Sequence, residues 1–365
     1  MKICFIVGTL SYSGAEKILY NMTQKLKERG HEISILLLSC SEINDNISGI
    51  SQYPLFDIKE ESKNKFIRVG LRIKRIRRVL KSNDFDLIVS FGMKFNLDSI
   101  LSTMFLKTPI ILCERNDPQN DPKSRILAFR RFLTYRFAQG FVFQTDEIKS
   151  YFSNSIQRKS TVIPNFIEKN VGVDNLYNPQ KKSFSTVGRL DDNQKDQSNL
   201  IKAFSIFNEE YKDYTLEIYG EGPDRDKYEK LIQKLNISDK VFLKGRVKNP
   251  MNFIKNSEAF ILSSKFEGMP NALIESLAQG IPSIATNCSG GGAKYLIENE
   301  VNGLLVPVGD EKQLSDAMKK IIQKKKSREE IIKNSNNINQ KLEINRIVEM
   351  WETYFREIIN KNSKK

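Results

Sequence analysis

Short apolar runs alternate with amphipathic segments along almost the whole chain. Buried strands are predicted at residues 2–8, 31–38, 86–90 and 109–113, and a helical pattern over 15–29 ends at Gly30. The alternation begins again after Lys181, with strand-like runs at 183–187, 214–219, 240–243, 259–262 and 282–286. Because strands that alternate with helices form parallel sheets covered on both faces, the predicted class is α/β with doubly wound sheets.

Two Rossmann-like domains follow from this pattern. The first is predicted over 1–168 and the second over 182–343, joined by a stretch of little periodicity. An apolar stripe containing Ile347, Trp351 and Phe355 predicts a helix at 344–361 that packs back on the first domain. Ligands of such sheets bind beyond the carboxyl ends of the strands, so the expected site is a cleft between two facing sheet edges.

Composition adds one unusual feature, a net charge of +14 over 365 residues. A basic protein seeks anionic partners: nucleic acid, an anionic membrane surface or phosphorylated substrates. The four cysteines are widely spaced without a CxxC pair, and a single histidine excludes a zinc-ligand set. Asp84 and Asp86 are interpreted as the start of a strand and not as a metal-binding pair. The sequence shows no signal peptide and no membrane-spanning run, so a cytosolic protein is expected.

Two loops that follow strands have the residues for phosphate binding. The first runs from Gly8 through Gly14 into a helix, whose N-terminal amides favour anions, although a simple tight turn explains it equally well. The second places Arg189 and Lys195 after the first strand of the second domain, where they could clamp a diphosphate. The alternative is a solvated turn in which Arg189 pairs with Asp191 or Asp192.

The most informative segment carries two carboxylates around a helix start. Pro270 suits the first turn and Gly280 ends the helix, which places Glu267 in the preceding loop and Glu275 about one turn inside. A carboxylate there can accept sugar or ribose hydroxyls, and the amides of Gly268, Met269 and Asn271 could serve a phosphate or hydroxyl. The alternative is that both glutamates only favour the helix dipole.

The combined pattern resembles the retaining family 4 glycosyltransferases of the GT-B fold, of the type that builds bacterial envelope polysaccharides. The resemblance covers nearly the whole chain in order, and the glutamate segment is its most specific part. It is carried by Ser13-Gly14-Ala15-Glu16, Gly188-Arg189-Leu190 with Lys195, Gly220-Glu221-Gly222-Pro223, Gly245-Arg246-Val247, the pair Glu267 and Glu275, and residues 302–307.

The resemblance implies a role for each matching residue. Arg189 and Lys195 would neutralise the leaving diphosphate without a metal or other cofactor. Glu267 would contact the transferred sugar, with the amides of Gly268, Met269 and Asn271 beside it; Glu275 would take the ribose hydroxyls. The backbone of Val247 would read the base, and Gly14 would allow close approach to the donor phosphates. Many relatives have a histidine where this chain has Glu114 and Arg115, which either bind phosphate or form a surface ion pair.

The positive charge concentrates in the predicted acceptor-binding domain. From Lys63 to Lys81 there are nine basic residues and no acidic one, with Arg68, Arg72 and Arg75 in one row of a predicted helix. A second basic and aromatic stretch covers 125–136. An ordinary solvated helix face is the alternative, but such clustering favours an anionic membrane surface or a lipid diphosphate.

The sequence thus favours transfer of a hexose or N-acetylhexosamine from a UDP-sugar to a polyprenyl-diphosphate-linked glycan. The expected location is the cytoplasm, peripheral on the inner face of the cytoplasmic membrane. A nucleotide-sugar epimerase on the same fold would want more acid and base groups than this histidine-poor chain offers. A nucleic-acid-binding protein would leave the two phosphate loops unexplained, so nucleic acid is not an expected partner.

Overall fold

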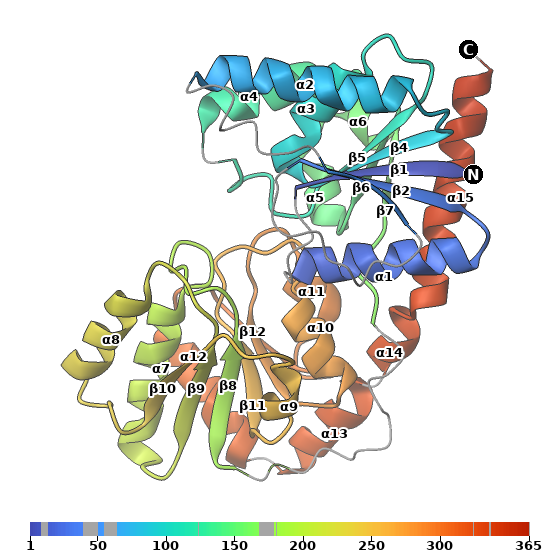
Figure 1. Ribbon diagram of the computed structural model, residues 1–365. Helices are drawn as coiled ribbons and strands as arrows, with labels where there is room; N and C mark the ends of the chain where they lie inside the picture. The colour runs from blue at the N-terminus through green and yellow to red at the C-terminus, as the bar shows by residue number, and fades with distance from the viewer. Residues whose placement is uncertain are drawn as a thin grey trace. The chain divides into compact units, whose positions relative to one another are not determined.

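The computed structural model describes residues 1–8, 14–38, 50–54, 64–122, 124–167, 179, 181–323, 325–335 and 337–364. Cys40, Lys63 and most of the predicted linker lie outside them. The chain divides into two compact units: the first unit joins Met1–Phe166 to Ile344–Lys365, and the second unit is Ile167–Glu343. Each unit contains one parallel sheet with helices on both faces (Figure 1), which confirms the predicted α/β class.

The first unit is built on a seven-stranded sheet in the order β3-β2-β1-β4-β5-β6-β7, and every neighbouring pair is parallel. The strands of this sheet are β1 (Lys2–Val7), β2 (Glu32–Leu37), β3 (Ser51–Pro54), β4 (Leu87–Phe91), β5 (Ile110–Cys113), β6 (Gly140–Phe143) and β7 (Ser160–Val162). The central strands β1, β4 and β5 are buried and mostly apolar because both faces of the sheet are covered.

Alternate residues of these strands enter two separate cores. Ile3 and Phe5 of β1 belong to the core on one face, and Cys4 and Ile6 to the core on the other. The helices of the first unit are α1 (Gly14–Glu28), α2 (Lys65–Lys81), α3 (Met93–Thr103), α4 (Arg125–Tyr135), α5 (Asp146–Ser150), α6 (Asn154–Gln157) and the C-terminal α15 (Ile344–Ser363).

The chain returns to the first unit through α15. Its apolar stripe, including Trp351 and Phe355, lies in the same core as Phe5 and the apolar face of α1. At the polar end of this contact, the carboxylate of Glu352 lies 2.6 Å from His31 Nε2 and 2.8 Å from Arg29 Nη1. The single histidine of the chain therefore has a structural role between β2 and α15.

The second unit repeats the plan with a six-stranded parallel sheet in the order β10-β9-β8-β11-β12-β13. Its strands are β8 (Ser183–Val187), β9 (Thr215–Tyr219), β10 (Val241–Gly245), β11 (Ala259–Leu262), β12 (Ser283–Thr286) and β13 (Leu304–Val306). Its helices are α7 (Gln197–Glu210), α8 (Arg225–Lys234), α9 (Met251–Ile254), α10 (Asn271–Ala278), α11 (Gly292–Leu296), α12 (Glu311–Gln323), α13 (Lys325–Ser335) and α14 (Asn337–Lys341).

Strands β3, β6, β7 and β13 were not among the strands predicted from the sequence. β3 and β7 contain polar residues and therefore lack an apolar run, whereas β6 and β13 are apolar but only four and three residues long. Pairing with a neighbouring strand, and not local pattern, defines them.

Candidate functional site

In the second unit, two glycines allow the loops after β8 and β9 to pack directly on each other. The amide of Gly188 donates to the carbonyl of Tyr219 over 3.0 Å, and that of Leu190 donates to Glu221 O over 3.0 Å. A Cβ on Gly220 would lie 1.9 Å from Gly188 O, and one on Gly222 would lie 2.3 Å from Leu190 O. Any larger side chain at either position would force these loops apart.

Arg189 extends from this packed loop into solvent. Its side chain is exposed and makes no hydrogen bond or ion pair with another described residue. The pairing with Asp192 that the sequence allowed does not occur: Asp192 instead pairs with Lys227 at 2.6 Å and accepts a hydrogen bond from the Ser198 amide at 3.0 Å. The guanidinium is therefore available to an anionic ligand.

Lys195 and Glu267, 72 residues apart, form the centre of the candidate site. The ammonium of Lys195 lies 2.5 Å from Glu267 Oε1, and Ser264 donates to the same oxygen over 2.7 Å. Ser263 anchors the other partner by donating to the Lys195 carbonyl over 2.8 Å. The Glu267 carboxylate, 6% exposed, is thus held by one cation and one hydroxyl at the carboxyl ends of β8 and β11.

Sequence reasoning did not assign roles to Ser263 and Ser264. Both follow the buried strand β11 directly, and this is the one signal that could have marked them, because side chains at the carboxyl ends of parallel strands line binding sites. Their hydroxyls orient the two charged residues that the sequence did identify.

The helix α10 begins at Asn271 with Pro270 at its N-cap, as the sequence pattern predicts. The loop before it is fixed by a close backbone approach, since a Cβ on Gly292 would lie 2.0 Å from Gly268 O. Met269 is buried in an apolar core of the second unit, so its side chain supports the loop from within. Glu275 is half-buried about one turn inside α10.

Val247 follows β10 and is half-buried against the same apolar core as Met269. Gly245, two residues earlier, has φ of 72°, a left-handed conformation that glycine adopts without strain. This turn sets the direction of the backbone at Val247.

Three further residues that the sequence singled out, Gly14, Glu114 and Arg115, belong to the first unit. Gly14 is the exposed first residue of α1, and the loop residues before it lie outside the described part of the chain. Glu114 is only 1% exposed and accepts a hydrogen bond from Tyr135. Burial raises the pKa of Glu114 to about 7, against the opposing hydrogen bond from Tyr135 and the charge of Arg131.

Arg115 has different partners, so the surface ion pair between Glu114 and Arg115 is wrong. Its guanidinium donates to Asn165 Oδ1 over 2.5 Å and stacks 4.4 Å from the centre of the Phe91 ring. Burial lowers the pKa of Arg115 to about 10. Asn165 also accepts from Gln144 over 2.8 Å, which fixes the orientation of the arginine.

The basic row on α2 is partly neutralised from a neighbouring helix. Arg72 pairs at 2.5 Å with Asp98, a buried aspartate of α3 that no count of charges along α2 would reveal. Arg75 also has interaction partners, and Arg68 is half-buried. The outward charge of α2 therefore comes mainly from its exposed residues Lys74, Arg78 and Lys81.

No helix in the described part of the chain is long and apolar enough to cross a membrane. Across those same residues, no three His, Cys, Asp or Glu side chains gather into a possible metal site.

Two family models match the chain in consecutive stretches. The model of Glycosyltransferase Family 4 matches residues 12–171, and that of Glycosyl transferases group 1 matches residues 172–338. Together they cover both units.

Similar proteins agree with this assignment. The GalNAc-alpha-(1->4)-GalNAc-alpha-(1->3)-diNAcBac-PP-undecaprenol alpha-1,4-N-acetyl-D-galactosaminyltransferase of Campylobacter jejuni is 28% identical over 372 residues and 99% of both chains. A glycosyltransferase of Methanocaldococcus jannaschii is 33% identical over 268 residues, which span 65% of each chain. Anabaena HepE, solved with UDP and glucose, shares the fold with a TM-score of 0.82 and 16% identity over 98% of this chain and 100% of its own. The chain therefore belongs to glycosyltransferase family 4 and has the GT-B fold.

Proposed function

We propose that this chain is a retaining glycosyltransferase that moves a hexose or N-acetylhexosamine from a UDP-sugar to a hydroxyl of a polyprenyl-diphosphate-linked glycan. It acts at the inner face of the cytoplasmic membrane in the assembly of a surface polysaccharide or glycan. The name of the Campylobacter relative describes transfer to an undecaprenol-diphosphate-linked glycan, and HepE was solved with UDP. Both support the proposed substrates.

The observation that carries the proposal is the pairing of Lys195 with Glu267, with an unpaired arginine on the same loop as Lys195. An ammonium has three donors, so Lys195 can keep Glu267 and still bind a diphosphate. Arg189, which has no protein partner in the described chain, adds a second positive charge to the leaving group. Two fixed cations at the departing diphosphate do the work that a metal ion does in other transferases, so no metal is required.

The other residues of the second unit position the donor. Glu275 accepts the ribose hydroxyls, and the backbone at Val247 reads the base. Glu267, oriented by Lys195 and Ser264, contacts the sugar, with the loop from Gly268 to Asn271 beside it. Contacts to the base, the ribose and the diphosphate hold the anomeric carbon of the donor in a fixed position for the acceptor hydroxyl. This orientation lowers the entropic part of the activation barrier.

The chemical step needs no strong protein base. The bond between the anomeric carbon and the β-phosphate oxygen breaks, and a bond from that carbon to the acceptor oxygen forms on the same face of the sugar. The proton of the acceptor hydroxyl passes to the departing phosphate oxygen. Arg115 of the first unit contributes a positive charge to donor or acceptor phosphate, and Gly14 allows the start of α1 to approach the donor. The buried Glu114 supports this region from inside through Tyr135.

Helix α2 binds the acceptor diphosphate in this proposal. Its exposed cations Lys74, Arg78 and Lys81 add to Arg68 and Arg75, while Arg72 is held by Asp98 and fixes α2 to α3. A diphosphate carries charge that several such cations can share.

Helix α4 provides the membrane contact. Phe129 and Phe132 are 61% and 70% exposed, and Ile126 and Leu127 are also exposed. The exposed arginines Arg125, Arg130 and Arg136 accompany them, whereas Arg131 is buried and donates to the carbonyl of Pro118 over 2.9 Å. A helix with bare aromatic side chains and flanking cations suits an anionic bilayer surface.

The donor half of the proposal is tested by thermal stabilisation with UDP, GDP, ADP and CMP, each with and without EDTA. A nucleotide at 100 times its Kd should add about 2.7 kcal/mol to the free energy of unfolding. A shift with UDP that survives chelation supports the metal-independent transferase. No shift with any nucleotide contradicts the diphosphate clamp.

The membrane half is tested by co-sedimentation with vesicles of phosphatidylglycerol and phosphatidylcholine. Phe129→Ser with Phe132→Ser should reduce binding, since each phenylalanine that enters the bilayer interface contributes about 2 kcal/mol. Phe105→Ser is the matched control, because Phe105 is even more exposed but lies outside α4. Equal loss in both variants would contradict a role for α4.

A further inference from the structure

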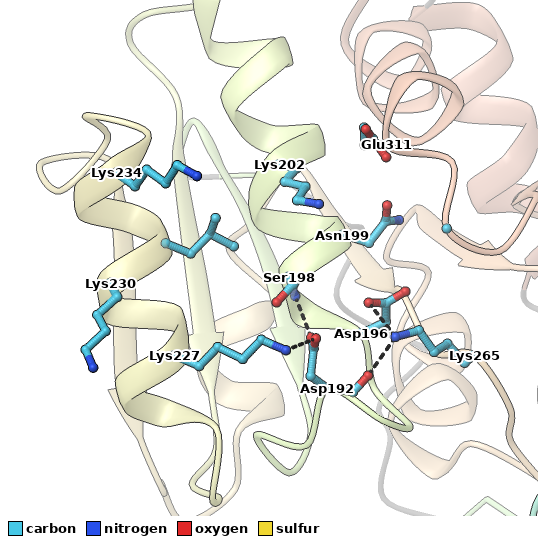
Figure 2. A pocket seen from close by; sticks show the side chains of 12 residues that line it. Asp192, Asp196, Ser198, Asn199, Lys202, Lys227, Lys230, Lys234, Lys265 and Glu311 are labelled. Carbon is cyan, nitrogen blue, oxygen red and sulfur yellow. Dashed lines mark hydrogen bonds and ion pairs between the residues drawn. The ribbon is translucent and has the colours of Figure 1, made fainter.

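A hollow of about 560 Å³ lies in the second unit, between α7, α8 and the start of α12. None of the residues proposed to bind the donor lines it. Figure 2 shows Lys227, Lys230 and Lys234 along α8 on one side and residues of α7 facing them. Its lining is formed by Asp192, Asp196, Ser198, Asn199, Lys202, Lys227, Lys230, Leu231, Lys234, Lys265, Gly309 and Glu311.

The charge of this hollow is not balanced by its own side chains. Lys227 pairs with Asp192 at 2.6 Å, and Lys265 pairs with Asp196 at 3.1 Å. The remaining lysines, Lys202, Lys230 and Lys234, form no ion pair within the described chain, and Glu311 is the one acid left to oppose them. Figure 2 shows Lys234 reaching from α8 towards α7, where Lys202 lies.

A buried donor in the wall of the hollow has no acceptor. Asn199 is only 6% exposed, and its Nδ2 makes no hydrogen bond with the described residues. Leaving a buried amide donor unpaired is costly, so native structures usually supply an acceptor from protein, water or ligand. An anion with several acceptor oxygens could accept a hydrogen bond from Asn199 Nδ2 and pair with both Lys202 and Lys234.

The side-chain types narrow the class of anion. No arginine and no aromatic residue from the described ranges lines the hollow. Lysine acts as a compact point charge and is a common ligand of phosphate groups. Without an aromatic surface there is nothing on which a nucleotide base could stack, and Leu231 is the single large apolar contact.

We propose that this hollow binds a small ligand with two or more phosphate groups and no base, such as inorganic polyphosphate or a sugar bisphosphate. Lys202 and Lys234 neutralise the phosphates from opposite helices, Asn199 Nδ2 donates to one phosphate oxygen, and Lys230 lies at the rim. The volume falls in the range of small-molecule sites.

The site shares its framework with the proposed donor loop. Asp192 lies between Arg189 and Lys195 in the sequence, and Asp196 directly follows Lys195. Lys265 directly follows Ser264 and comes shortly before Glu267. Lys265 also donates to the Asp192 carbonyl over 2.9 Å. The same ion pairs that form the wall of the hollow therefore hold the donor loop, yet phosphate binding in the hollow does not depend on the donor proposal.

The test is calorimetric binding of inorganic tripolyphosphate to the full chain at low salt. Lys202→Gln with Lys234→Gln should weaken binding at least about tenfold. Lys212→Gln with Lys333→Gln is the matched control, since both lysines are exposed on the second unit and do not line the hollow. The control variant should bind like the wild type.

A second readout locates the ligand. Tripolyphosphate should protect Lys202 and Lys234 from acetic anhydride, as measured by peptide mass spectrometry, and leave Lys212 and Lys333 unprotected. Equal affinity of the wild type and the Lys202/Lys234 variant overturns the proposal, as does the absence of binding to the wild type. Binding that Arg189→Ala removes while the Lys202/Lys234 variant keeps it places the anion at the donor loop and also overturns the proposal.

Discussion

Glu114 and Glu267 each follow the end of a buried strand, one in each unit, but their surroundings differ. Glu114 after β5 accepts a hydrogen bond from the phenol of Tyr135 and forms no ion pair within the described chain. Glu267 after β11 is nearly as buried, yet it has an ammonium at 2.5 Å and a serine hydroxyl at 2.7 Å. Two buried carboxylates in loops after strands of two similar sheets thus have different partners, a neutral phenol in one unit and a lysine with a serine in the other.

The difference teaches that position at a strand end does not by itself make a carboxylate functional. The feature that distinguishes Glu267 is a direct ion pair with a cation from another loop, which offsets part of the hydration that a carboxylate loses on burial. Lys195 supplies this for Glu267. Glu114 forms no ion pair within the described chain, and burial raises its pKa to about 7 although the charge of Arg131 acts against this rise.

The largest expected effect is on catalysis. Glu267→Gln should lower sugar transfer about 1,000-fold, because the amide keeps the size but loses the charge. Loss of the ion pair with Lys195 should also lower the thermal midpoint, so transfer is measured at a temperature at which the variant is folded. UDP release in the presence of acceptor is the measurement. Glu114→Gln, with the same chemical change, should stay within about threefold of wild type. Comparable losses in both variants would erase the distinction between the two carboxylates.

The next effect is on the pH dependence of stability. Since the pKa of Glu114 rises from 4.5 to about 7 on folding, the folded protein binds the extra proton. The stability from this residue is present below about pH 4.5 and falls as the pH rises towards 7, by up to about 3 kcal/mol. Urea unfolding of wild type and Glu114→Gln between pH 5 and 8 measures how the unfolding free energy of each protein changes with pH. If both change equally, Glu114 does not take up a proton on folding.

A third carboxylate sharpens the comparison, since Glu352 is buried but paired. Burial acts to raise its pKa, but hydrogen bonds from His31 and Arg29 outweigh burial and the pKa is lowered. The stability that Glu352 contributes to the fold is therefore present above the pKa of 4.5 that this carboxyl has in the unfolded chain. That contribution is lost as the pH falls through the lower pKa of the folded protein. Glu352→Gln should cost about 2 kcal/mol at pH 7 and much less below pH 4, measured by urea unfolding. If the two proteins differed in unfolding free energy by the same amount at every pH, the stabilisation would not come from the charged form of Glu352.

The smallest effect concerns the unpaired cation beside the Lys195–Glu267 pair. Arg189→Ala should weaken UDP binding about tenfold, because an exposed charge in contact with a phosphate is partly screened. Calorimetry with uridine is the control, as the nucleoside lacks the diphosphate and should bind both proteins equally. A similar loss for uridine would mean that Arg189 shapes the loop and does not contact the diphosphate.

Much of this fold was predictable from local pattern. Long apolar runs such as 183–187 and 259–262 gave strands with the observed bounds, because a strand buried on both faces needs a continuous apolar segment. Pro270 and Gly280 likewise bounded α10. Strands β3 and β7 were missed because they contain polar residues, and the short strands β6 and β13 were missed although they are apolar.

The candidate site was predictable in part. The positions of Arg189, Lys195 and Glu267 after strands left a structural role equally open, and the resemblance to family 4 glycosyltransferases singled them out as candidates. The partners of Arg72, Glu114 and Arg115 could not be predicted. These partners are Asp98, Tyr135 and Asn165, which lie in other elements, and no local sequence pattern indicates the contacts.

The sequence by itself determined the α/β class and the doubly wound sheets, and it marked the candidate phosphate-binding loops, because hydrophobic period and turn residues act over a few positions. The tertiary structure alone decided which charges are compensated. It paired Arg72 with Asp98, buried Glu114 beside a neutral phenol, and gave Glu267 its lysine. Electrostatic compensation acts through space between distant segments, and only the folded chain fixes those distances.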